Sequence, residues 1–384
     1  MQLSIHHSTK FPSIKTTIFT TMSALAREHN AVNLSQGFPD FEADPALFNE
    51  VKKAMKAGHN QYAPMAGLPL LRERIAAKTE TFYSASYNPE TEVTVTAGAT
   101  QAIFTAVLSV VRPKDEVIIL EPAYDCYAPA VELAGGICKH VPLTAPDYSV
   151  PWDVVRKFIT KNTKMLIINT PHNPTGSILN AADMQKLEKL LLGTDIVVLS
   201  DEVYEHILFD GYEHQSVARF PGLAGRSFVV SSFGKSYHTT GWKIGYVLAP
   251  EALTAEFRKV HQYNVFAVNT PMQYAFSEML ARYDDLKGLS AFYQAKRDLF
   301  LQAVKGSRFT AKASSGTYFQ NICYKKISEE NDLEFAMRLT REHKIASIPL
   351  SVFYTDKRDE KMLRFCFAKN DDTLKKAADI LCRI

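Results

Sequence analysis

Two lysines flank a polar loop in the segment SSFGKSYHTTGWKIGY, residues 231–246, which lies between two apolar runs typical of buried strands. Lysine is almost never buried without a reason, so an ordinary surface loop is the simplest interpretation of this segment. The alternative interpretation is chemical. The amine of Lys235 can bond covalently to a carbonyl compound, and Lys243 can hold a phosphate as a point charge.

A second candidate site follows the apolar run at 92–97, which ends in the residues AGAT. Gly98, Ala99 and Thr100 offer free backbone N–H groups and a hydroxyl at the start of a predicted helix. A helix N-terminus of this kind is a favourable place for a phosphate. A common helix cap built from small residues explains the same pattern equally well.

Two further strands are predicted to end in polar side chains. The run at 164–169 is followed by NTPHNPTG, where Asn173 lies in a turn fixed by two prolines and a glycine. The run at 195–200 ends in SDEVY, which places the carboxylate of Asp201 at the end of a strand. Each residue alone is explained by turn or cap chemistry, but the carboxyl ends of strands in open α/β sheets are where ligands bind.

Together these groups match the needs of one cofactor, pyridoxal phosphate. Its pyridine nitrogen requires an anionic partner such as Asp201, and its aldehyde requires an amine such as that of Lys235. Its phosphate requires hydroxyls and a cation, which Thr100, Ser232 and Lys243 supply. An amine that is partly desolvated and flanked by cations also loses its proton more easily.

A large sheet is required to position these residues. Short runs rich in Val and Ile alternate with helical segments, which predicts an α/β fold with a mostly parallel seven-stranded sheet covered by helices. The predicted strand runs are 92–99, 116–124, 135–143, 164–176, 195–204, 227–235 and 243–250.

The pattern changes near residue 275. Long helical stretches then alternate with the strand-like segments GTYFQNICY, IASIPLSVF and KMLRFCFA, which predicts a smaller α+β domain. We expect the N-terminal segment to pack against this domain. The expected organisation is therefore an N-terminal segment at 1–44, a large cofactor-binding domain at 45–275 and a small domain at 276–384.

Composition excludes several classes of protein. The 384 residues are 46% hydrophobic and 22% charged, and a net charge of +3 does not call for a nucleic-acid or membrane partner. The five cysteines show no metal-binding spacing, so we expect no metal site. Their odd number favours buried free thiols in a reducing compartment, and the absence of a signal-peptide pattern predicts a cytoplasmic protein.

The chain resembles the class I, fold-type I pyridoxal-phosphate aminotransferases from about Phe11 to its C-terminus. Within that family it is most similar to the subgroup of bacterial methionine aminotransferases and kynurenine or glutamine transaminases. The motifs that carry the resemblance occur in the family order: NLSQGFPDF, NQYAPMAG, VTAGAT, PAYDCY, NTPHNPTG, SDEVYEHI, SSFGKSYHTTGWKIGY and LRFCFAK.

The resemblance implies a role for each matching residue. Lys235 is expected to bind the cofactor and carry the substrate α-proton, while Asp201 pairs with the pyridine nitrogen. The other implied cofactor contacts are Asn173 and Tyr204 at the phenolic oxygen, Tyr124 on the ring face, and Gly98, Ala99, Thr100, Ser232, Lys243 and the partner subunit's Tyr62 at the phosphate. The implied contacts to the substrate carboxylate are Arg364, Asn173 and the Gly37 backbone. Lys243 stands where many relatives carry Arg, and Tyr124 where some carry Trp or Phe.

The resemblance also implies a homodimer that acts on amino acids and 2-oxo acids. Residues 11–24 and 261–269 are expected to line the side-chain pocket, where Phe19 and Tyr263 favour neutral or aromatic side chains. Methionine is the first expected donor, followed by glutamine, phenylalanine and kynurenine. One alternative is a carbon–sulfur β-lyase acting on cysteine conjugates. Another is a non-catalytic sensor domain, although a match beginning near residue 11 leaves no room for a DNA-binding module.

Overall fold

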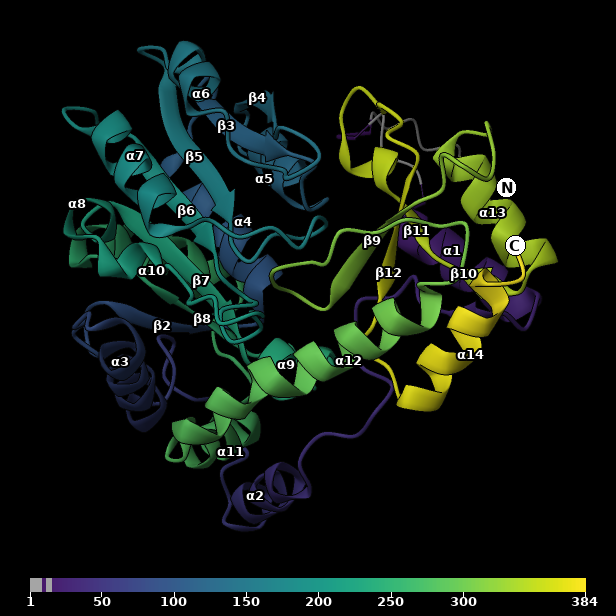
Figure 1. Cartoon of the computed structure of the whole chain (residues 1–384). Helices are drawn as coiled ribbons and strands as arrows, with labels where there is room; N and C mark the ends of the chain where they lie inside the picture. The colour runs from purple at the N-terminus through teal and green to yellow at the C-terminus, as the bar shows by residue number, and fades with distance from the viewer. Residues whose placement is uncertain (1–8, 12–15) are drawn as a thin grey trace, which may run out of the picture.

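The computed structural model describes residues 9–11 and 16–384, which form two bodies lying side by side (Figure 1). One body is built around a seven-stranded sheet, and the other around a three-stranded and a two-stranded sheet. Within these residues, every helix is too short or too polar to cross a membrane.

The large sheet has the strand order β2-β8-β7-β6-β5-β3-β4. β8 runs antiparallel to both of its neighbours, β2 and β7, and the remaining strand pairs are parallel. Each strand overlaps one of the seven predicted runs, which confirms the predicted sheet. The strands are β2 (Val93–Thr96), β3 (Glu116–Glu121), β4 (Ile137–Pro142), β5 (Thr163–Asn169), β6 (Val197–Asp201), β7 (Ser227–Ser232) and β8 (Gly245–Leu248).

Both faces of this sheet are apolar because successive side chains on a strand point in opposite directions. Val117 and Ile119 of β3 pack in one cluster, whereas Ile118 and Leu120 pack in the other. The first face is covered by α4 (Ala99–Val110), α5 (Tyr127–Leu133) and α10 (Glu251–Asn264). The second is covered by α3 (Pro69–Tyr83), α6 (Trp152–Phe158), α7 (Ala181–Leu191) and α8 (Pro221–Ala224).

The second body joins the two ends of the chain. β1 (Val32–Asn33) pairs in parallel with β10 (Ile345–Ala346), so the N-terminal segment packs with the C-terminal third as predicted. The three-stranded sheet has the order β11-β12-β9 and is fully antiparallel. Its elements and their neighbours are β9 (Phe319–Cys323), β11 (Ile348–Pro349), β12 (Met362–Cys366), α1 (Ile18–Glu28), α13 (Asp332–Glu342) and α14 (Asp371–Leu381).

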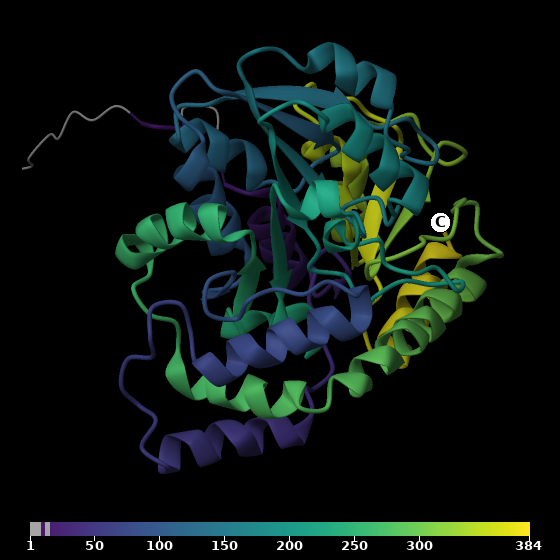
Figure 2. The same ribbon diagram turned by 90° about the vertical axis from the view of Figure 1, so that its left-hand side faces the viewer.

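Three helices lie outside these layers. α12 (Gly288–Val304) runs from the side of the large sheet to α14 in the small body (Figure 1). α2 (Pro45–Lys56) packs along α11 (Thr270–Leu280) at the periphery, as the turned view also shows (Figure 2). The remaining short helices are α9 (Phe233–Ser236), η1 (Val217–Arg219), η2 (Thr240–Trp242), η3 (Tyr283–Lys287) and η4 (Leu350–Phe353). The domain boundaries at residues 44 and 275 stay predictions.

All five cysteines carry free thiols. Cys126 and Cys366 are buried, as expected for thiols that serve as small apolar residues. The expectation is wrong for Cys382, which is exposed at the residue that follows α14.

Candidate active site

A cavity of about 140 Å³ lies at the carboxyl ends of β5, β6 and β7, beside the N-terminus of α4. This is the edge at which the sequence predicts a ligand site. Nine of the residues singled out in the sequence line it: Ala99, Thr100, Tyr124, Asn173, Asp201, Tyr204, Ser232, Lys235 and Lys243.

Asp201 is the last residue of β6 and is 4% exposed. The phenol of Tyr127 donates a hydrogen bond to its Oδ2 at 2.6 Å, and Asn169 on the neighbouring β5 donates to its backbone carbonyl at 2.8 Å. Burial raises the pKa of Asp201 to about 6, although Tyr127 and the positive charge of Lys235 act in the opposite direction. The carboxylate is therefore held rigidly and is more costly to ionise than a surface aspartate.

Lys235 lies on α9, a single turn that follows β7 and is capped by the hydroxyl of Ser232. Its Nζ donates hydrogen bonds to the phenol oxygen of Tyr318 at 2.7 Å and to the carbonyl oxygen of Gly37 at 3.3 Å. Removal from water lowers the pKa of Lys235 to about 8, helped by the charge of Lys243. An amine with this pKa is substantially neutral near pH 8 and can act as a nucleophile or a base.

The corner of the cavity at α4 has the features of an anion site. Gly98 precedes α4 with a φ of +79°, and a Cβ at this position would lie 3.2 Å from Nζ of Lys243. Glycine thus allows the lysine to reach the helix N-terminus. The hydroxyls of Thr100 and Ser232 line the same cavity. Helix N–H groups, hydroxyls and an amine together suit a phosphate.

Arg364 of β12 supplies a second anion site and is 1% exposed. Its Nη1 donates to Oδ1 of Asn173 at 2.6 Å, and its Nη2 donates to the carbonyl of Ser35 at 3.3 Å. Its Nε has no hydrogen-bond partner within residues 9–11 and 16–384, and none of the ion pairs formed there includes Arg364. A buried guanidinium that lacks a carboxylate partner is suited to bind one from a ligand.

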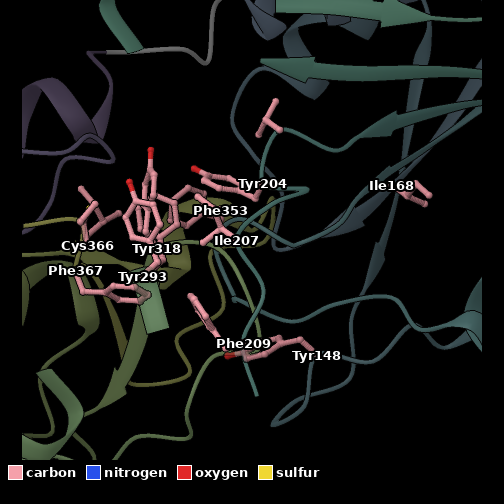
Figure 3. Packing of buried hydrophobic residues seen from close by; sticks show 14 of the residues in the cluster. Tyr148, Ile168, Tyr204, Ile207, Phe209, Tyr293, Tyr318, Phe353, Cys366 and Phe367 are labelled. Atoms are coloured by element: carbon pink, nitrogen blue, oxygen red, sulfur yellow. The ribbon is translucent and has the colours of Figure 1, made fainter. Parts of the chain in front are cut away.

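Aromatic rings pack around the guanidinium of Arg364. The ring of Phe319 lies 3.9 Å from the guanidinium carbon, and those of Phe353 and Phe19 lie at 5.1 and 5.4 Å. Tyr204 and Tyr318 meet edge to face at 5.1 Å in the cluster that Figure 3 displays. These contacts fix the orientation of the guanidinium by packing as well as by hydrogen bonds.

A second cavity, of about 710 Å³, adjoins the first at Tyr124. Phe19 lies in its wall, and its role in a substrate side-chain pocket stays a prediction. Residues 12–15 of the predicted lining lie outside the described residues. Most of the wall is apolar, but it includes the carboxylates of Asp125, Glu121 and Glu132, the imidazole of His140 and the amine of Lys357.

A buried ionic network supports the loops that carry Asp201 and Lys235. Glu205, which follows β6 closely, accepts hydrogen bonds from Lys78 of α3, Tyr83, Tyr246 and Ser231 of β7. Burial alone would raise the pKa of Glu205, but the adjacent Lys78 charge brings it well below the ordinary value. The network ties the end of β6 to the end of β7 and thereby fixes the spacing of the two catalytic candidates.

Three other predicted residues do not line the cavity of their own chain: Tyr62, which is expected to act on the partner subunit's site, Tyr263 and Gly37. Tyr62 is 80% exposed and makes a T-shaped contact with Phe266 at 5.1 Å, and Tyr263 is 91% exposed near the end of α10. Gly37 approaches the site with its carbonyl, which accepts from Lys235 and Tyr318. A carbonyl oxygen accepts hydrogen bonds and does not bind a carboxylate, so these two hydrogen bonds do not support the predicted contact between the Gly37 backbone and the substrate carboxylate.

Three residues of the site were not predicted from the sequence: Tyr127, Asn169 and Tyr318. Asn169 ends an apolar strand and could have been found by the rule that identified Asp201. Tyr127 closes the motif PAYDCY, in which only Tyr124 was singled out, and Tyr318 lies in the strand-like segment GTYFQNICY, which carries no motif.

Comparison with known proteins places this geometry among enzymes. The family model described as aminotransferase class I and II matches residues 29–381. The methionine aminotransferase of Escherichia coli K12 is 47% identical over 97% of this chain and 97% of that protein. A kynurenine–oxoglutarate transaminase from Dictyostelium discoideum is 32% identical over 100% of this chain and 98% of its own length. The solved structure of YbdL from Escherichia coli, assigned a methionine aminotransferase function, superposes with a TM-score of 0.97 at 46% identity, covering 99% and 100% of the two chains.

Proposed function

The chain belongs to the class I and II aminotransferases, and on this premise we propose that it moves the α-amino group of methionine, and of other neutral or aromatic amino acids, to a 2-oxo acid with pyridoxal phosphate as cofactor. One observation carries the proposal. The amine of Lys235, the carboxylate of Asp201 and the anion corner at α4 face one cavity, while Arg364 stands close by without a carboxylate partner.

The residues present fit the cofactor. Lys235 would hold its aldehyde, Asp201 its pyridine nitrogen, and the α4 corner with Lys243 its phosphate. Asn173 and Tyr204 would hold its phenolic oxygen, and Tyr124 its ring face. When bound, the cofactor supplies an electron-accepting ring that stabilises negative charge on the substrate α-carbon.

The chain itself orients the substrate and moves the proton. Arg364 would bind the α-carboxylate as a bidentate fork, because Asn173 and the ring of Phe319 hold its guanidinium in place. The Nζ of Lys235, once free, would accept the α-proton as a neutral amine and carry it as an ammonium. The aromatic walls around Arg364 would keep water from the reacting atoms.

The large cavity supports a neutral side chain. Its wall is apolar at Phe19 and Phe353. It also holds three carboxylates, of which Glu121 pairs with His140 at 2.8 Å, against one amine, that of Lys357. A second carboxylate on the substrate would therefore meet more negative than positive charge. Methionine, phenylalanine and kynurenine offer apolar surface to the same wall. The cavity shares Phe19 with the aromatic shell of Arg364, which supports the proposal that the substrate side chain would lie there when the α-carboxylate is bound.

Single-turnover rates with a panel of amino donors test this function. We expect kcat/KM for methionine to exceed that for aspartate by about 100-fold, since like charges in a closed site cost several kcal/mol. Asp125→Asn should lower this methionine-to-aspartate ratio about tenfold, because it removes one of the carboxylates in the cavity wall. A preference for aspartate would contradict the pocket assignment, and release of pyruvate and ammonia from cysteine conjugates without an oxo-acid acceptor would indicate the β-lyase reaction.

We also propose that the protein is a cytoplasmic homodimer in which Tyr62 completes the phosphate site of the partner. Large apolar side chains are exposed on α2, at the end of α10 and in the loops beside them, and Tyr62 contacts Phe266 at a ring distance of 5.1 Å. These side chains are Phe48, Met55, Tyr62, Tyr263 and Phe266. Soluble proteins rarely leave such a cluster uncovered, which favours a second copy of the chain as its partner.

Mixing two inactive variants tests whether Tyr62 acts across the dimer. A hybrid of Tyr62→Ala and Lys235→Ala subunits contains one site with both residues intact, so we expect about one quarter of wild-type activity after subunit exchange. Mixing Lys235→Ala with Asp201→Asn should restore nothing, because both residues lie in the same subunit's cavity. If the first mixture also stays inactive, Tyr62 does not act in trans.

A further inference from the structure

The hydrogen bonds of Lys235 point to a residue that no motif of the sequence marks. The amine donates to the phenol oxygen of Tyr318 at 2.7 Å and to the carbonyl of Gly37 at 3.3 Å. Both acceptors belong to segments outside the seven-stranded sheet, whereas Lys235 follows β7 of that sheet. The lysine therefore spans the boundary between the two bodies.

One orientation of the Tyr318 phenol satisfies the hydrogen bonds of the phenol, the Gly37 carbonyl and the Lys235 amine together. Its O–H donates to the carbonyl of Gly37, so its oxygen presents a lone pair to the amine of Lys235. Burial raises the pKa of Tyr318 well above its usual value, so the phenol is neutral at neutral pH. It can accept a hydrogen bond from an ammonium but does not neutralise its charge.

Packing holds Tyr318 in this position. Its side chain is fully buried, with the ring of Tyr204 at 5.1 Å on one side and that of Tyr293 at 5.8 Å on another (Figure 3). Gly37 is held equally closely, since a Cβ there would lie 2.7 Å from the ring of Phe319. Neither acceptor can retreat from the lysine without disturbing the packing.

We propose that Tyr318 is a further catalytic residue, which holds the amine of Lys235 whenever that amine is not bonded to the cofactor. This inference rests on the proposed function. The neutral amine accepts the substrate α-proton and becomes an ammonium, which then donates to Tyr318 and Gly37 until the proton is released. Tyr318 neither gains nor loses a proton; it orients the lysine and stabilises its charged form.

Chemical labelling of the cofactor-free protein tests this role without any turnover. Cyanate reacts only with the neutral amine, and mass spectrometry of the peptide containing residue 235 gives the pH at which labelling is half-maximal. We expect the Tyr318→Phe variant to lower this midpoint by about one pH unit, because the ammonium loses a hydrogen-bond acceptor. An unchanged midpoint would overturn the proposal.

Tyr293→Phe is a matched control. Tyr293 is equally buried and lies against Tyr318, but its hydroxyl has no hydrogen-bond partner in the part of the chain that the structure describes. Both variants lose a phenol oxygen at a fully buried position, so a merely structural effect would shift the labelling midpoint equally in both. Equal shifts in the two variants would therefore also overturn the proposal.

Kinetics of the loaded enzyme give a second measurement. We expect Tyr318→Phe to lower kcat about 10- to 100-fold and to increase the α-deuterium isotope effect, with little change in KM for methionine, because Arg364 is untouched. A raised KM with unchanged kcat would count against the proposal. Failure of borohydride to fix a cofactor on Lys235 would refute the proposed function instead, and the labelling result would stand unaffected.

Discussion

Lys235→Ala is expected to abolish transamination, with single-turnover rates reduced more than 10⁴-fold. The loss combines two roles that no other side chain of the cavity can assume. The other amine there, on Lys243, is committed to the anion corner beside Gly98. The variant should still bind the cofactor reversibly, because Asp201 and the α4 corner remain, but borohydride treatment should no longer attach it to the chain.

Chemical rescue separates this prediction from simple misfolding. Small primary amines such as methylamine should restore part of the lost rate, and the restored rate should rise with the basicity of the amine. Peptide mapping of the borohydride-treated wild type should find the cofactor on residue 235 alone. Attachment to another lysine, or retained turnover in the variant, would overturn the assignment of the whole site.

Asp201→Asn is expected to lower kcat about 10³-fold, while making the cofactor-free protein more stable at neutral pH. The catalytic loss follows from removing a buried unit charge, whose interaction with a nearby cation is worth about 4 kcal/mol at an effective dielectric constant of 20. Asparagine keeps the shape and an oxygen for the Tyr127 hydrogen bond, so the variant isolates the charge.

The stability gain has a defined pH range. The pKa of Asp201 is raised to about 6 in the folded chain, against about 3.9 in an unfolded chain, so its ionised form disfavours folding above pH 6. This cost is about 3 kcal/mol at full ionisation and vanishes below pH 4. Denaturant unfolding of the cofactor-free protein should therefore give the variant a higher free energy of unfolding than wild type at pH 7.5, and the same free energy at pH 4.

Asp332→Asn is the control for both measurements. Asp332 is also buried and hydrogen-bonded, by Ser351 at 2.7 Å, and burial also raises its pKa, but it lies outside both cavities. This variant should alter stability in the same direction and leave kcat unchanged. If Asp201→Asn kept full activity, the proposed partnership with the pyridine nitrogen would be wrong.

The sequence predicted the parts of the molecule that local chemistry determines. Strands buried on both faces require continuous apolar runs, so all seven strands of the large sheet were recognisable. Asp201, Lys235 and Gly98 directly follow such runs, and the topology then brings them to one edge. The pairing of β1 with β10 was predicted only as packing, because two-residue strands leave no periodic signal.

The parts that were missed depend on contacts between distant segments. Tyr318 meets Lys235 across 83 positions of sequence, and Tyr127 meets Asp201 across 74, so their roles arise only after folding. Tyr263 was assigned to the pocket by resemblance, yet it is almost fully exposed in a single chain. Residues that act across a subunit boundary cannot be placed by the periodicity of one chain.

The adjacent residues Tyr318 and Phe319 contact different ends of the site, the end with the reactive amine and the end that would bind the substrate carboxylate. One touches the amine of Lys235, and the other lies under the guanidinium of Arg364. A single-residue slip of the segment that ends in β9 would move both rings out of these positions and disable both ends of the site at once. Laboratory evolution toward new donors should therefore diversify the wall at Thr16, Thr17, Phe19 and Asp125 and leave this dipeptide invariant.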